Sequence, residues 1–399
     1  MSRPDLARAL GVNPSSASSL VHELIEMGLL RTAGTGESRG GRPAARLEVD
    51  PGFSVALGAE ISHRGVVAAA VDLGGRVLCR AERKLPLKAG PQAMLEELCR
   101  ALRSARQEVA EITPCGAGIG IAGVMGVEPG VSREFPNVPG WHDVNVAQAV
   151  RTATDLEVEV DNDVRAATLA EFRYGAGRGL GDFVYLHIRR GIAAGAVFGG
   201  KLHTGAFRGA GELGHFQVAP DGPVCYCGSN GCLESVASPR ALLSQAAEAV
   251  RQGVKTSLAV NGTHPEGIAA EELFAAAAAG DRLARNLVER AGESIGRITA
   301  GLDNVLDPRA IILGGLLADG ADVLAASIES NHRAMVMPLL ENTTEFRRAL
   351  LGPDAAVIGG AALVFEKMFS SPEELLRAPR GRRGTASGGK STEEETKCE

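Results

Sequence analysis

Four side chains that bind transition metals lie in one short, glycine-rich segment of the sequence, between Gly209 and Glu234. They are one imidazole and three thiols, at His215, Cys225, Cys227 and Cys232. Glycines between the cysteines permit a tight turn, so the sulfurs can converge on one ion. Four protein ligands fill a tetrahedral zinc site and leave no vacant position for water, which favours a structural Zn2+ over a catalytic one. The alternative is three buried free thiols.

Two carboxylates flank this cluster. Glu212 precedes His215, and Glu234 follows Cys232. Folding around a metal would hold both acids and the imidazole in fixed positions, where the acids can accept hydrogen bonds from hydroxyl groups. The alternative for the two glutamates is a solvated loop face.

These residues carry a resemblance to a known family. The motifs G-E-L-G-H and C-x-C-G-x-x-G-C-L-E resemble the signature of the ROK family, which comprises bacterial repressors, uncharacterised reading frames and sugar kinases. The resemblance implies a zinc-stabilised loop in which Glu212, His215 and Glu234 contact a sugar. It also implies an α/β fold, with a two-lobed domain of the actin and hexokinase (ribonuclease H-like) type preceded by a winged helix-turn-helix.

Residues 1–50 carry the pattern of a helix-turn-helix with a wing. Apolar residues recur at helical spacing on both sides of a break at Gly11, Asn13 and Pro14. The second helix would present four hydroxyls to base edges and phosphates, from Ser15, Ser16, Ser18 and Ser19. The glycine-rich segment that follows carries Arg39 and Arg42, which resemble a hook for a narrow minor groove. The alternative is a helical hairpin used for dimerisation.

ROK repressors place a further helix before the one that begins here. We therefore expect the first helix of this domain to be missing, either because the start codon is assigned downstream of the true one or because the domain is damaged.

Two segments depart from the phosphate-binding loops of the family's kinases. Residues 60–64 read Glu-Ile-Ser-His-Arg where the kinases have D-x-G-G-T, and residues 189–195 replace a G-T-G-x-G-G-G loop with Arg-Arg-Gly-Ile-Ala-Ala-Gly. Without glycine the backbone cannot approach a phosphate closely, and the two arginines occupy the space of the γ-phosphate. We therefore expect neither ATP binding nor kinase activity.

The resemblance assigns further sugar contacts to Gly123, Asn137, Asn162 and Asp163. Asp163 matches the general base of the kinases, and in a chain without phosphate loops it would be vestigial. The alternatives are ordinary turns at Gly123 and Asn137 and a helix-capping role alone for Asp163.

The rest of the pattern divides the chain into two lobes and a tail. We expect the first lobe over 51–165, and the second over 166–371 with its zinc loop at 209–234 and a final helix that can pack back on the first lobe. Helical patterns cover 91–111, 239–251 and 269–302, and residues 355–364 resemble a strand with a glycine turn. Residues 372–399 are rich in glycine, serine and charge, which predicts a disordered tail.

Composition limits the partners. Lys and Arg number 42 against 48 Asp and Glu, for a net charge of −6, so any DNA contact must be local. The four remaining cysteines are scattered, which favours a reducing cytoplasm over a disulfide framework. We find no secretory signal and no apolar run long enough to span a membrane.

These observations predict a sugar-responsive regulator resembling xylose-type and N-acetylglucosamine-type repressors of the ROK family. It would be cytoplasmic and non-catalytic, form a homodimer or homotetramer, and bind operator DNA and a sugar or sugar-phosphate effector. One alternative is an ATP-dependent kinase of hexoses or amino sugars that retains Asp163. Another is a sugar-binding protein whose head has lost DNA binding.

Overall fold

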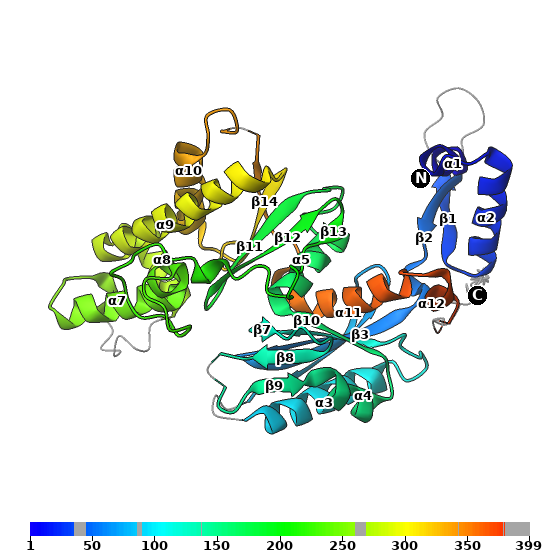
Figure 1. Cartoon of the computed structure of the whole chain (residues 1–399), viewed down its shortest axis with the longest axis horizontal. Helices are drawn as coiled ribbons and strands as arrows, with labels where there is room; N and C mark the ends of the chain where they lie inside the picture. Colours follow the sequence, from blue (N-terminus) through cyan, green and yellow to red (C-terminus); the bar gives the residue numbers. More distant parts are fainter. Residues whose placement is uncertain are drawn as a thin grey trace, which may run out of the picture.

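The computed structural model describes residues 1–35, 45–85, 90–136, 138–259, 269–341, 343–377 and 379. They form a small N-terminal head and two α/β lobes, each built on a five-stranded sheet (Figure 1). Within the described residues, no helix is both long enough and apolar enough to cross a membrane.

The head contains two helices and one antiparallel pair of strands. Its elements are α1 (Arg3–Leu10), α2 (Pro14–Glu26), β1 (Leu30–Thr35) and β2 (Ala45–Val49). α1 ends where Gly11 adopts a left-handed conformation at φ 65°, and α2 begins where the Asn13 side chain accepts a hydrogen bond from the Ser16 N–H. These caps agree with the predicted break between the helices. Residues 36–44, the tip of the predicted wing, lie outside the described residues.

The first lobe has a mixed sheet in the order β10-β6-β3-β4-β5. The strands are β3 (Val55–Ser62), β4 (Gly65–Asp72), β5 (Val77–Arg83), β6 (Ala117–Ile121) and β10 (Val158–Asn162). β3, β4 and β5 are antiparallel, whereas β6 and β10 run parallel to β3. The main core lies between this sheet and the helices α3 (Pro91–Glu108) and α4 (Val146–Thr154). A three-stranded sheet adjoins it, built from β7 (Val124–Met125), β8 (Val131–Glu134) and β9 (His142–Asn145).

The second lobe has a sheet in the order β13-β12-β11-β14-β15. The strands are β11 (Phe183–Ile188), β12 (Ile192–Phe198), β13 (Lys201–Leu202), β14 (Ala310–Gly315) and β15 (Glu345–Arg348). Its helices are α6 (Leu233–Ala237), α7 (Pro239–Arg251), α8 (Ala270–Ala278), α9 (Arg282–Leu306) and α10 (Asp322–Met335). The helical pattern over 269–302 is thus two helices, because the Asp281 side chain caps the start of α9.

Two helices join the lobes, α5 (Asp163–Tyr174) and α11 (Ala355–Met368), which pack against each other (Figure 1). α11 also lies on the first sheet, and glycine in the strands permits the close approach. A Cβ at Gly58 would be 2.0 Å from the Val357 carbonyl oxygen, and one at Gly118 would be 1.8 Å from that of Gly360. The sequence prediction of a strand and glycine turn over 355–364 is therefore wrong. A fully buried apolar run has no periodicity that distinguishes a strand from a helix.

The last described element is α12 (Pro372–Arg377), so the first residues of the predicted tail are helical. Residues 378 and 380–399 lie outside the described residues.

Candidate functional site

The four predicted metal ligands converge. The ligand atoms of His215, Cys225, Cys227 and Cys232 all lie within 4.8 Å of one another. The sulfurs of Cys227 and Cys232 are 3.7 Å apart, and the Cys225 sulfur is 3.6 Å from Nδ1 of His215. Two sulfurs bound tetrahedrally to one zinc ion at about 2.3 Å each would be separated by about 3.8 Å. These residues can therefore hold one tetrahedral metal ion.

The backbone around the cysteines requires glycine. Gly231 has φ 61°, and a Cβ there would lie 1.5 Å from the Ala219 carbonyl oxygen. In return, the Gly231 carbonyl oxygen accepts hydrogen bonds from the N–H groups of Val218 and Ala219. The Cys225 N–H donates to the Ser229 carbonyl oxygen at 2.7 Å and closes the turn between the first two cysteines. Backbone hydrogen bonds within the chain thus hold the turn that carries the three cysteines, called the knuckle below.

The two ring nitrogens of His215 face different groups. Nδ1 faces the Cys225 sulfur, whereas Nε2 lies 2.8 Å from the Tyr226 hydroxyl and 3.8 Å from a carboxylate oxygen of Glu212. One imidazole can therefore contribute to the metal cluster and also orient the neighbouring acid. Sequence reasoning missed Tyr226, although its position between two ligand cysteines was a signal.

Glu234 lies in the first turn of α6 and contacts the turn between β11 and β12. One of its carboxylate oxygens accepts a hydrogen bond from the Ile192 N–H at 3.1 Å. A Cβ at Gly191 would be 2.2 Å from that oxygen, so the turn fits the carboxylate only with glycine. The turn lies in one of the two segments where the sequence is expected to have lost a phosphate-binding loop, and here a carboxylate of the same chain accepts the N–H of the residue that begins β12.

The charges of two acids, one from each lobe, act on a third acid, Asp163. The three acids are Glu60 at the end of β3, Asp163 at the start of α5 and Glu212 just before the 3-10 turn Leu213–His215. Burial, together with the carboxylates of Glu60 and Glu212, raises the pKa of Asp163 to about 7. Burial likewise raises the pKa values of Glu60 and Glu212. Glu60, which is 7% exposed, was considered in the sequence only as part of a lost phosphate loop.

Gly123 and Asn162 are brought together. The Asn162 amide donates to the Gly123 carbonyl oxygen at 3.0 Å, and its side-chain oxygen accepts from the N–H groups of Val164 and Arg165. Asn162 is thus the N-cap of α5. The capping role considered for Asp163 belongs chiefly to Asn162, so most of the hydrogen-bonding capacity of the Asp163 carboxylate is available for other partners. Asn137 lies outside the described residues.

A buried ion pair lies directly behind these residues. The side chains of Asp161 and Arg165 are only 4% and 1% exposed. The Asp161 carboxylate also accepts the Asn162 N–H at 2.9 Å and lies 3.4 Å from the Arg208 guanidinium. Arg165 in turn donates to the Ala210 carbonyl oxygen at 3.0 Å. The pair thereby connects the end of β10 to the segment that leads to Glu212.

Arginines lie near two half-buried imidazoles, His63 and His187, that are in or next to the two altered phosphate segments. Burial, Arg190 and Arg240 lower the pKa of His63 to about 4. Burial, Arg189 and Arg64 lower the pKa of His187 to about 4. Both imidazoles are therefore neutral at pH 7.

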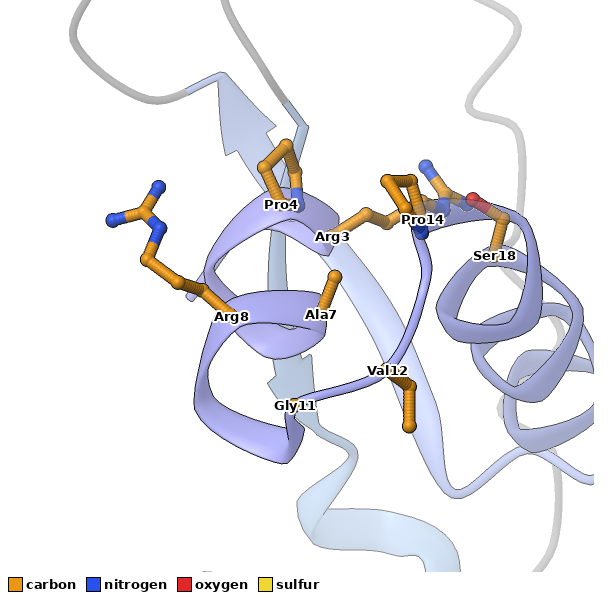
Figure 2. A pocket seen from close by; sticks show the side chains of 8 residues that line it. All are labelled: Arg3, Pro4, Ala7, Arg8, Gly11, Val12, Pro14 and Ser18. Carbon is orange, nitrogen blue, oxygen red and sulfur yellow. The ribbon is translucent and has the colours of Figure 1, made fainter.

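The four serines predicted to contact DNA are exposed on α2. Ser15 donates its hydroxyl to the Asn13 side chain at 2.7 Å, which leaves Ser16, Ser18 and Ser19 less committed. Ser18 also lines a hollow of about 520 Å³ between α1 and α2, with Arg3 and Pro14 nearby (Figure 2). Arg39 and Arg42 lie outside the described residues.

Comparisons with known proteins identify sugar kinases and repressors as relatives. A glucokinase of Thermotoga maritima is 30% identical over 312 residues, which cover 78% of this chain and 98% of the glucokinase. The transcriptional repressor Mlc of Escherichia coli is 27% identical over 385 residues, which cover 96% of this chain and 93% of Mlc. A solved ROK family transcriptional regulator, a homologue of Mlc, is 29% identical, with a TM-score of 0.77 over 91% of each chain.

The model of the ROK family matches residues 56–367, which include both lobes, the metal-ligand cluster and the three acids. The chain belongs to the ROK family.

Proposed function

We propose that this chain is a sugar-responsive transcription regulator that binds operator DNA through residues 1–50. The proposal rests on the presence of the N-terminal head in the part of the chain that aligns with transcription regulators. The glucokinase alignment covers 78% of the chain, whereas alignments with Mlc and with the solved regulator cover 96% and 91%. The family model begins at residue 56, whereas an alignment of 385 residues with Mlc must extend into residues 1–50, which form the two capped helices and the strand pair. A head of this kind reads paired half-sites most readily in a dimer, so we also propose a homodimer or homotetramer.

The proposed sugar site is formed by the three acids together with His215, Glu234, Asn162 and Gly123. Carboxylates and imidazole nitrogens accept hydrogen bonds from sugar hydroxyls, and charge-assisted hydrogen bonds of this kind are stronger than neutral ones. The metal-ligand cluster supports the site because Glu212 and Glu234 bracket it. In this proposal the metal is a structural Zn2+ that holds the acids in place.

We further propose that the chain does not phosphorylate its sugar. Phosphoryl transfer depends on positioning and on charge stabilisation by backbone N–H groups and Mg2+. In the β11–β12 turn, one N–H already donates to Glu234, and two arginines stand where the kinases have glycine and threonine.

A specific observation favours sugar kinase as the second candidate. A general base works best with a pKa near the operating pH, and the pKa of Asp163 is raised to about 7. A sugar sensor would retain the same carboxylate as a hydrogen-bond acceptor. Release of ADP that depends on sugar, and that is lost in Asp163→Asn, would establish the kinase instead.

Metal content tests the knuckle. We expect about one zinc per chain in purified protein, and loss of most of it in Cys232→Ser, because the remaining ligands no longer close the tetrahedron. Cys79→Ser changes a thiol outside the cluster and should retain the metal. Elemental analysis measures both. Zinc-free parent protein that binds sugar with undiminished affinity would contradict the coupling between metal and sugar site.

The protonation of Asp163 should be visible in stability. Its folded-state pKa lies above that of the unfolded chain, so its contribution to stability is complete below about pH 4 and is lost as the pH rises to about 7. Asp163→Asn removes this loss. The variant should become more stable than the parent over that range, by up to about 4 kcal/mol above pH 7. Urea unfolding of both proteins at several pH values measures the difference, and a difference independent of pH would contradict the assignment.

Added negative charge on α2 tests the head. Ser18→Glu and Ser19→Glu should each weaken binding to a fragment of the chain's own promoter by about tenfold or more, because the new carboxylates approach DNA phosphates. Gln107→Glu adds the same charge on an exposed turn of α3 and should leave binding unchanged. Electrophoretic mobility shift measures all three. Equal weakening by Gln107→Glu, or no effect of either serine substitution, would remove α2 from the DNA-binding surface.

A further inference from the structure

A cavity of about 380 Å³ lies at the junction of the two lobes, apart from the proposed sugar site. Its walls come from β10 of the first lobe, β13 of the second lobe and the two joining helices α5 and α11, which lie close together in Figure 1. Its size falls within the range of pockets for small molecules, about 300–1,000 Å³. Aromatic and aliphatic side chains form part of the wall, including Phe172 and Leu363.

The charged groups in this wall leave an excess of positive charge. Arg173 pairs with Glu366, and Asp161 is neutralised by Arg165 behind the wall. This leaves the cations of Lys201, Lys367 and Arg208 facing one further acid, Glu159. In the described part of the chain, neither lysine has an ion-pair partner. Burial raises the pKa of Glu159, whereas the neighbouring charges of Lys367 and Arg208 lower it.

Two independent features of Arg208 are energetically unfavourable, one in its backbone and one in its side chain. Its backbone has φ 58°, in the left-handed region that residues with a Cβ seldom adopt. Its Nε is shielded from solvent and has no hydrogen-bond acceptor within the described residues. A buried donor without an acceptor is destabilising, and strained residues of this kind cluster at functional sites. An anion in the cavity would interact with the positive charge of the Arg208 guanidinium.

Arg208 is also linked to the proposed sugar site. Its guanidinium donates to the Val160 carbonyl oxygen at 2.9 Å and lies 3.4 Å from the Asp161 carboxylate. The same carboxylate accepts the N–H of Asn162. Four residues after Arg208 comes Glu212, another of the proposed sugar ligands. A shift of the Arg208 side chain would therefore act on Asp161 and, through it, on the position of Asn162, a proposed sugar ligand.

We propose that this cavity binds a small anion, a phosphate or carboxylate group of a metabolite, and that its occupancy changes sugar affinity. The anion is recognised by the positive charges of Lys201, Lys367 and Arg208. The second half of the proposal rests on the proposed sugar site. The first half does not, because anion binding can be measured without sugar or DNA.

Calorimetric titration of the full chain with inorganic phosphate, and separately with citrate, at ionic strength held constant with chloride tests the first half. We expect saturable binding of at least one of them at millimolar concentration, and the preferred probe tells phosphate from carboxylate recognition. Lys201→Gln and Lys367→Gln should each weaken it about tenfold, since each removes one charge-assisted hydrogen bond. Lys255→Gln, which removes an exposed lysine outside the cavity, should bind like the parent. Absence of saturable binding, or equal weakening by all three substitutions, would overturn the anion site.

The second half is tested by titrating glucose, xylose and N-acetylglucosamine with and without the anion that binds. We expect the affinity of the sugar that binds to change with anion present in the parent, and to change less in Lys367→Gln. Anion binding with unchanged sugar affinity would overturn the coupling alone. Absence of sugar binding under both conditions would instead overturn the proposed sugar site.

Discussion

The arrangement of the proposed site depends on one buried ion pair, Asp161 with Arg165. Removing one partner of such a pair leaves an uncompensated charge in the interior, which typically costs about 3–5 kcal/mol. Here the loss of the ion pair would also disturb the proposed sugar site. The pair fixes the end of β10, from which Asn162 and Asp163 project, and through Ala210 it holds the segment that precedes Glu212. One interaction therefore links proposed sugar ligands that belong to different lobes.

The metal-ligand cluster is a second, local constraint on the same site. Nδ1 of His215 faces the sulfurs and Nε2 faces Glu212, so an ion bound by the cysteines would also fix the acid. The Glu234 carboxylate bonds to the β11–β12 turn, where the family's kinases hold phosphate. In the proposed function, these residues would bind sugar while Glu234 takes up an N–H group that a nucleotide phosphate would otherwise use.

Local chemistry was predictable from the sequence, whereas contacts between distant segments were not. The ligand spacing, the helix break at Gly11 and Asn13, and the strand before Asn162 follow from side-chain type and from turn and cap preferences. The helix α11 was predicted as a strand, because its burial on several sides depends on glycines in distant strands. Arg208 and Glu60 were missed for the same reason: their roles depend on neighbours far away in the chain.

If one chain couples sugar binding to DNA binding, as proposed, thermodynamic linkage allows the coupling to be measured directly. The measurement is the affinity of a sugar that binds, from glucose, xylose and N-acetylglucosamine, with and without a saturating fragment of the chain's own promoter. We expect two different sugar affinities, and we expect added sugar to change the DNA affinity by the same factor. Equal sugar affinities in the presence and absence of bound DNA would contradict the proposed coupling.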